Sequence, residues 1–128
     1  MSATAQQLYN ICDGTWPAAA TKRLGPWTLR DGQGGGKRVS AATAEGPVQK
    51  TDIHAAEVAM QNMGQTPLFM IRDGDEALDQ LLESHGYEVV DPVVMYSISV
   101  DALTGIEIPR VTTFCVWEPL AIMAEIWA

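Results

Sequence analysis

Residues 26–43 read PWTLRDGQGGGKRVSAAT, and the interpretation of the whole chain starts from this stretch. Residues 27–30 form one strand-like run and residues 37–42 a second, on either side of the consecutive glycines 34–36. Glycine reverses the backbone through positive φ without the steric cost of a Cβ atom. The stretch therefore predicts a β-hairpin with a glycine turn and a basic pair directly after it.

The composition indicates one acidic, folded domain. The chain has 128 residues, of which 47% are hydrophobic, and its formal net charge is −8. Nucleic acids and anionic membranes favour basic surfaces, so the charge argues against either partner. No stretch approaches the roughly 20 apolar residues of a membrane span, and the N-terminus lacks the pattern of a signal peptide. We expect a cytoplasmic protein whose ligand is a cationic or neutral small molecule.

Apolar periodicity predicts further elements on both sides of the hairpin. Helices are expected over residues 3–12, 51–63 and 75–85. Strands are expected over residues 67–71, 87–100 and 111–117, with a bulge or an edge at Asp91–Pro92 in the second of these. The run 67–71 is continuously apolar, which predicts a central strand covered on both faces. The predicted fold class is α/β or α+β, with a mixed, largely antiparallel central sheet and helices packed on it.

The C-terminal segment predicts a helix that needs a packing partner. This helix is expected from Pro119, with an apolar face of Leu120, Met123, Ile126 and Trp127. Three explanations stay open: the helix folds back onto its own sheet, it docks on a second copy in a homodimer, or the natural protein continues. We expect a first domain over residues 1–113, and a strand and helix over residues 114–128 that begin a following domain or make a dimer contact.

Several motifs, taken in order, resemble one protein family. Trp16–Pro17, the run WTLR at 27–30, the glycine turn and Lys37–Arg38 occur in the order found in a group of bacterial proteins of the GNAT superfamily of N-acyltransferases. Members of that group carry "WP", "GWLLR", a glycine-containing turn and an "RRANSV"-like strand. Two later segments, PLFMI at 67–71 and LDQLLESHGY at 78–87, are similar to the "PPVFQ" and "LDALLAARGY" segments of the group.

The resemblance implies a GNAT-like fold and acetyl transfer from acetyl-CoA to a small-molecule amine. The superfamily holds the pyrophosphate of the cofactor on an (Arg/Gln)-x-x-Gly-x-(Gly/Ala) loop that opens a helix. The nearest candidate here is residues 33–36, which precede Lys37–Arg38 and a predicted strand instead of a helix. Ser40–Ala41 also replaces the Asn-Ser of the family, and Gly35–Gly36 its aromatic-Thr pair. The chain is therefore expected to be the N-terminal part that lacks the cofactor loop.

Three side chains are candidates for substrate binding. Arg30 and Arg38, at equivalent ends of the predicted hairpin, can hold an anionic group, or they can pair with the excess carboxylates of the chain. Glu57 flanks the buried stripe of its helix and can act as a general base at the sheet edge, or it can be a solvated helix residue. No catalytic residue is assigned, and no metal site is expected.

The histidines and cysteines predict structural roles. His54 lies early in one helix and His85 at the end of another, where a histidine can cap carbonyl groups. Cys12 and Cys115 lie far apart and without metal-ligand spacing, so we expect reduced thiols. Two functions stay open: an N-acetyltransferase of the GNAT type, or a non-catalytic module that keeps the fold for binding or dimerisation.

Overall fold

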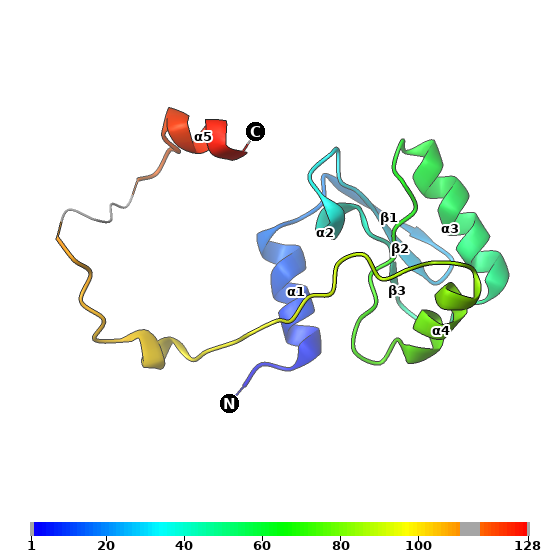
Figure 1. Cartoon of the computed structure of the whole chain (residues 1–128), viewed down its shortest axis with the longest axis horizontal. Helices are drawn as coiled ribbons and strands as arrows, with labels where there is room; N and C mark the ends of the chain where they lie inside the picture. Colours follow the sequence, from blue (N-terminus) through cyan, green and yellow to red (C-terminus); the bar gives the residue numbers. More distant parts are fainter. Residues whose placement is uncertain (1, 111–115, 128) are drawn as a thin grey trace. The chain divides into compact units, whose positions relative to one another are not determined.

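The structure is a computed structural model that describes residues 2–110 and 116–127. Its backbone divides into two units, residues 1–96 and 97–128. The first unit is mixed α+β, with helices beside a small antiparallel sheet (Figure 1), which confirms the coarse form of the predicted fold class.

The sheet of the first unit has three antiparallel strands in the order β1-β2-β3. β1 (Ala20–Leu24) and β2 (Trp27–Asp31) form a hairpin, and β3 (Thr43–Ala44) pairs with the other edge of β2. Gly25 turns this hairpin at a φ of 54°, which glycine adopts without strain. β2 was predicted from the sequence but β1 was not, because four of the five β1 residues are exposed and show no apolar alternation.

The prediction of a second hairpin strand over residues 37–42 is wrong. Residues Lys37–Ser40 form the short helix α2, and the chain rejoins the sheet only at β3. Gly36, with a φ of 101°, redirects the backbone into this helix, and the Ser40 hydroxyl donates to the Gly36 carbonyl. The buried Val39 side chain folds back on the glycine turn, so the tight turn and the helix form one local unit.

The predicted central strand at residues 67–71 is reduced to a single parallel bridge between Phe69 and Ala42. Ala42 N–H donates to the Leu68 carbonyl and Met70 N–H donates to the Ala42 carbonyl, both at 2.9 Å. Ala41 N–H donates to the Lys37 carbonyl at the end of α2 and is therefore not free to pair with this segment. Because only Ala42 presents both of its backbone groups to the segment, the pairing is one residue long.

The predicted helices at residues 3–12, 51–63 and 75–85 are confirmed, the first as α1 (Ala5–Thr15), and the other two cover one face of the sheet (Figure 1). α3 (Lys50–Asn62) buries Ile53, Ala56 and Met60, and α4 (Glu76–Ser84) buries Leu78 and Leu82. These residues pack with four residues of the sheet region, Trp27, Leu29, Ala42 and Ala44. Among the helices that the structure describes, none is both long and apolar enough to cross a membrane.

The predicted strand at residues 87–100 is also wrong. Residues 88–96 are exposed and carry no regular secondary structure, and a short 3-10 helix, η1 (Val100–Leu103), occupies the end of the predicted strand. The alternating side chains Val94, Tyr96 and Ile98 are all largely exposed. A strand needs a ladder of hydrogen bonds to a neighbour, and apolar alternation alone does not supply one.

The second unit contains η1 and the C-terminal helix α5 (Ala121–Trp127), which confirms the predicted helix. On α5 the side chains of Ile122, Met123 and Ile126 are exposed. Most of the predicted strand at 111–117 lies outside the described residues, and so does the predicted domain boundary after residue 113.

Trp27 is the centre of the core, and its replacement tests the fold. Its side chain is fully buried, its ring lies 4.9 Å from that of Phe69, and its Nε1–H donates to the Asp52 carbonyl at 2.9 Å. We expect Trp27→Phe to lower the free energy of unfolding by about 2 kcal/mol, because it leaves a void and removes the hydrogen bond to the Asp52 carbonyl. Trp16→Phe, at a residue 59% exposed, should change it by less than about 0.5 kcal/mol in the same urea titration. Equal effects of the two substitutions would contradict this description of the core.

Candidate functional site

The two faces of the sheet differ in chemistry, and the polar face is the candidate site. Along β2, Trp27 and Leu29 point into the core, while Thr28 and Arg30 alternate with them and point to the opposite face. Thr28 is the register partner of Thr43 on β3, so a second hydroxyl group lies on the same face. We call this side of the sheet, together with the charged residues bound to it, the polar face.

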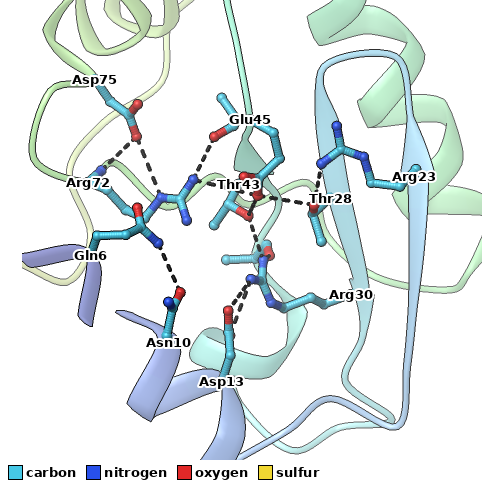
Figure 2. Close-up of polar contacts among 12 residues, drawn as sticks. Gln6, Asn10, Asp13, Arg23, Thr28, Arg30, Thr43, Glu45, Arg72 and Asp75 are labelled. Carbon is cyan, nitrogen blue, oxygen red and sulfur yellow. Dashed lines mark hydrogen bonds and ion pairs between the residues drawn. The ribbon is translucent and has the colours of Figure 1, made fainter. Parts of the chain in front are cut away.

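Arg30 is the most buried charged residue of the polar face, with 5% of its surface exposed. One terminal nitrogen, Nη1, donates to the Ala41 carbonyl at 3.1 Å and to the Thr43 hydroxyl at 2.9 Å. The other, Nη2, donates to both carboxylate oxygens of Asp13 at 3.0 and 3.2 Å (Figure 2). Burying a guanidinium costs free energy unless such partners replace water. Arg30 thus joins α1 (Ala5–Thr15) to the sheet.

Glu45 accepts hydrogen bonds from two hydroxyl groups of the polar face. Its Oε1 accepts hydrogen bonds from Thr28 at 3.1 Å and from Thr43 at 3.3 Å. Arg23 on β1 donates in turn to the Thr28 hydroxyl at 3.0 Å, so the chain of contacts crosses all three strands (Figure 2). The carboxylate is 35% exposed and stays accessible to a ligand.

Arg72 forms a second cationic centre beside Glu45. Its Nη2 donates to the Ala44 carbonyl at 2.6 Å and lies 3.6 Å from Glu45, and its Nε lies 4.0 Å from Asp75 (Figure 2). The guanidinium carbon is 5.6 Å from the centroid of the Tyr9 ring on α1. Arg72 thus fixes the end of β3 and faces α1 at the same time.

α1 is attached to the first unit mainly through polar contacts. It begins with a capping box between Thr4 and Gln7, and it has no buried residue. Among the described residues, its polar contacts to other parts of the chain include the Asp13–Arg30 pair, the Arg72 stacking and a hydrogen bond from Asp73 N–H to the Tyr9 hydroxyl at 2.8 Å. Because no residue of α1 is fully buried, less hydrophobic free energy holds it in place than holds α3 or α4.

Two cavities adjoin the polar face. The larger, about 1610 Å³, is lined by apolar side chains such as Leu68 and Phe69 and by charged groups. Its four cations are Arg30, Lys37, Arg38 and Arg72, and its five carboxylates are Asp13, Asp79, Glu83, Glu88 and Asp91. The smaller, about 620 Å³, is mainly polar and includes Asp13, Arg30 and Glu45. The site therefore offers both charges to a ligand.

The structure brings together two of the three predicted site residues. Arg30 and Arg38 line the larger cavity, whereas Glu57 does not. Arg30 is on β2 but Arg38 is exposed on α2, so they are not equivalent ends of one hairpin. Glu57 accepts a hydrogen bond from the Tyr87 hydroxyl at 2.6 Å and lies 3.6 Å from His54.

Sequence reasoning missed Asp13, Thr43, Glu45 and Arg72. Each lies far along the chain from at least one of its partners, and only the folded sheet brings them together. One signal was present: in a strand with period two, Thr28 and Arg30 must face away from Trp27 and Leu29. The predicted capping role of His85 is confirmed, because its Nδ1 lies 2.8 Å from the Leu81 carbonyl.

The glycine turn does not fit the pyrophosphate of acetyl-CoA. A Cβ atom at Gly34 or Gly36 would meet nothing within 4 Å, so these glycines form no close cradle, and their φ values of 80° and 101° explain them. A Cβ atom at Gly35 would lie only 2.9 Å from the Gly32 carbonyl oxygen, so a side chain at this position would clash with the turn itself. The turn opens a helix and not the predicted strand, but this helix has only four residues and a weak dipole.

Comparisons of this chain with protein-family models, with curated proteins and with solved structures find no match. The features of this chain that bear on its function are therefore the polar face and the order of the sequence motifs.

The Tyr87–Glu57 contact gives a testable alkaline pH dependence. Burial, and then the hydrogen bond and negative charge of Glu57, raise the pKa of Tyr87 well above its ordinary value of 10. Because the pKa of Tyr87 is higher in the folded than in the unfolded chain, the protonated side chain stabilises the fold at every pH below the unfolded-state pKa. This stability is lost as the pH rises above about 10. We expect Tyr87→Phe to lower the free energy of unfolding at pH 7 by about 1 kcal/mol and to remove this part of the alkaline loss.

The matched control for this prediction is Tyr96→Phe, at a side chain that is 90% exposed. Urea unfolding between pH 7 and 11 should give the same curve for this variant as for the wild type. An unchanged alkaline loss in Tyr87→Phe would show that the Tyr87–Glu57 contact does not carry it.

Proposed function

We propose that this chain is the acceptor-binding part of a GNAT-type N-acyltransferase, and that it binds the amine to be acylated. The observation that carries the proposal is the polar face. One side of a small sheet forms the core, and the other carries an accessible carboxylate, two hydroxyl groups and two arginines beside two cavities. The order of the motifs from Trp16 to Tyr87 supports the family.

Glu45 is the residue that we assign to the amine. Its Oε1 is held by Thr28 and Thr43, while its Oε2 takes no hydrogen bond or ion pair from a described residue. A carboxylate oriented by two hydroxyl groups can accept charge-assisted hydrogen bonds from an ammonium group in the smaller cavity. This role differs from the sequence hypothesis for Glu57, whose carboxylate contacts Tyr87 and His54.

The acyl donor is assigned to residues other than the glycine turn, since that turn does not fit its pyrophosphate. Acetyl-CoA supplies the activated acyl group when it is bound. The residues described above bind and orient the acceptor.

Ligand titration tests this assignment. We expect ethylamine to bind the chain, and Glu45→Gln to weaken this binding about tenfold or more, because the substitution removes a charge-assisted contact. Glu57→Gln is the matched control and should leave the Kd of ethylamine unchanged. Isothermal titration calorimetry gives these values, and a thermal shift measurement with acetyl-CoA should show no rise in Tm.

Three results would contradict parts of the proposal. Absence of amine binding would remove the acceptor role, and equal loss in Glu45→Gln and Glu57→Gln would remove the assignment to Glu45. A rise in Tm with micromolar acetyl-CoA would place the donor site on this chain. Acyl transfer to an amine by the natural protein, measured with acetyl-CoA, tests the family itself.

The second candidate is a non-catalytic module for binding or dimerisation. The exposed apolar side chains of α5 favour it, because Met123 and Ile126 lie three residues apart on one side of that helix. In this case a homodimer forms through α5.

Sedimentation velocity tests the dimer. We expect the wild type to form a dimer and the double variant Met123→Glu, Ile126→Glu to be monomeric, because the new carboxylates would be buried without partners. Glu125→Gln is the control on the same helix and should retain the dimer. A monomeric wild type at concentrations up to about 100 µM would exclude a dimer of ordinary affinity.

A further inference from the structure

The Asp13–Arg30 ion pair lies between the two cavities. Among the residues that the structure describes, these two alone line both the cavity of about 1610 Å³ and the cavity of about 620 Å³. A ligand that enters from either side therefore reaches the same pair of charges. If the pair opened, the apolar space of the larger cavity would connect with the polar space of the smaller one.

The Arg30 half of this pair is fixed in advance. The Ala41 carbonyl and the Thr43 hydroxyl hold Nη1, so the planar guanidinium presents Nη2 in one direction. The side chain is 6% exposed, which leaves the charge dependent on an anion at Nη2. A rigid, buried guanidinium of this kind is suited to bind a carboxylate.

The Asp13 half is held weakly by comparison. Its side chain is 53% exposed, and it belongs to α1, which has no buried residue. Both of its oxygens contact Nη2, which is the position that the carboxylate of a ligand would take. Returning Asp13 to water costs little, because an exposed carboxylate is already largely hydrated.

A single side chain separates Arg30 from Glu45. The Thr43 hydroxyl accepts from Arg30 at 2.9 Å and donates to Glu45 at 3.3 Å. Arg30 and Glu45 also line the same smaller cavity. A cation and a carboxylate at this short separation complement a ligand that carries a carboxylate and an ammonium group on neighbouring atoms.

We propose that Arg30 is a carboxylate-binding site that Asp13 occupies from within the chain, and that its ligand is an amino acid whose carboxylate displaces Asp13 while its ammonium group binds Glu45. The amine end rests on the proposed function, and the carboxylate end rests on the Arg30 geometry alone. In this arrangement α1 acts as an internal competitor, and its displacement accompanies binding.

Three probes separate the two ends of the site: acetate for the carboxylate, ethylamine for the amine and glycine for both. We expect Asp13→Ala to bind acetate at least about tenfold more tightly than the wild type, because no internal carboxylate competes. Glycine should bind this variant more tightly than acetate or ethylamine does. Asp91→Ala removes a different carboxylate of the larger cavity, one that pairs with the exposed Lys37, and should bind acetate as the wild type does.

Calorimetric titration at constant ionic strength gives the required dissociation constants. An acetate Kd that is equal in Asp13→Ala and the wild type, or a gain of the same size in Asp91→Ala, would overturn the proposal. Should Asp13→Ala fail to fold, Asp13→Asn keeps the shape of the side chain and permits the same comparison. Ethylamine binding reports on the proposed function separately, so a failure at Arg30 and a failure at Glu45 give different patterns.

Discussion

The burial of one positive charge organises the first unit. Arg30 lies on the strand that also supplies Trp27 and Leu29 to the core, and only 5% of its surface is exposed to water. Its hydrogen bonds must come from the protein, and they come from residues 41–43 and from Asp13 on α1. The same set of contacts positions β3 against β2 and attaches the N-terminal helix. A neutral residue at this position would remove the ion pair of α1 and leave the Tyr9 contacts to Arg72 and Asp73 among its described polar contacts.

Apolar periodicity and turn residues were sufficient to predict some secondary-structure elements and insufficient to predict others. The apolar spacing of Ile53, Ala56 and Met60 specified α3, because a helix satisfies its own backbone and needs only one packing face. Strands depend on partners, and the partners are not local. The predicted strand at 87–100 has no partner strand among the described residues. Residues 37–40 of the other predicted strand form α2, where Val39 is buried next to the glycine turn. β1 was missed because an exposed edge strand needs no apolar pattern.

Of the candidate site, Arg30 could be predicted from the sequence, and its contact partners could not. Arg30 was predicted from the sequence, with Arg38, as a residue at one end of the hairpin that could hold an anionic group. Its partners could not be predicted, since Asp13 and Thr43 reach it from either side along the chain, and Glu45 is reached through Thr43. Glu57 followed from its place beside a helix stripe, yet the chemistry around it is a tyrosine and a histidine. Local pattern identified unusual residues, and the sheet register determined which of them meet.

The edge strand β1 has a consequence for how this sheet can associate with other chains. Its exposed residues include Lys22 and Arg23. Cations on an edge strand discourage another strand from pairing there, because the incoming strand would have to desolvate them. At the opposite edge the segment around Phe69 forms a single bridge to Ala42, and Arg72 donates to the Ala44 carbonyl at 2.6 Å. Cations therefore stand at both edges of the sheet, and an added strand would have to desolvate them on either side.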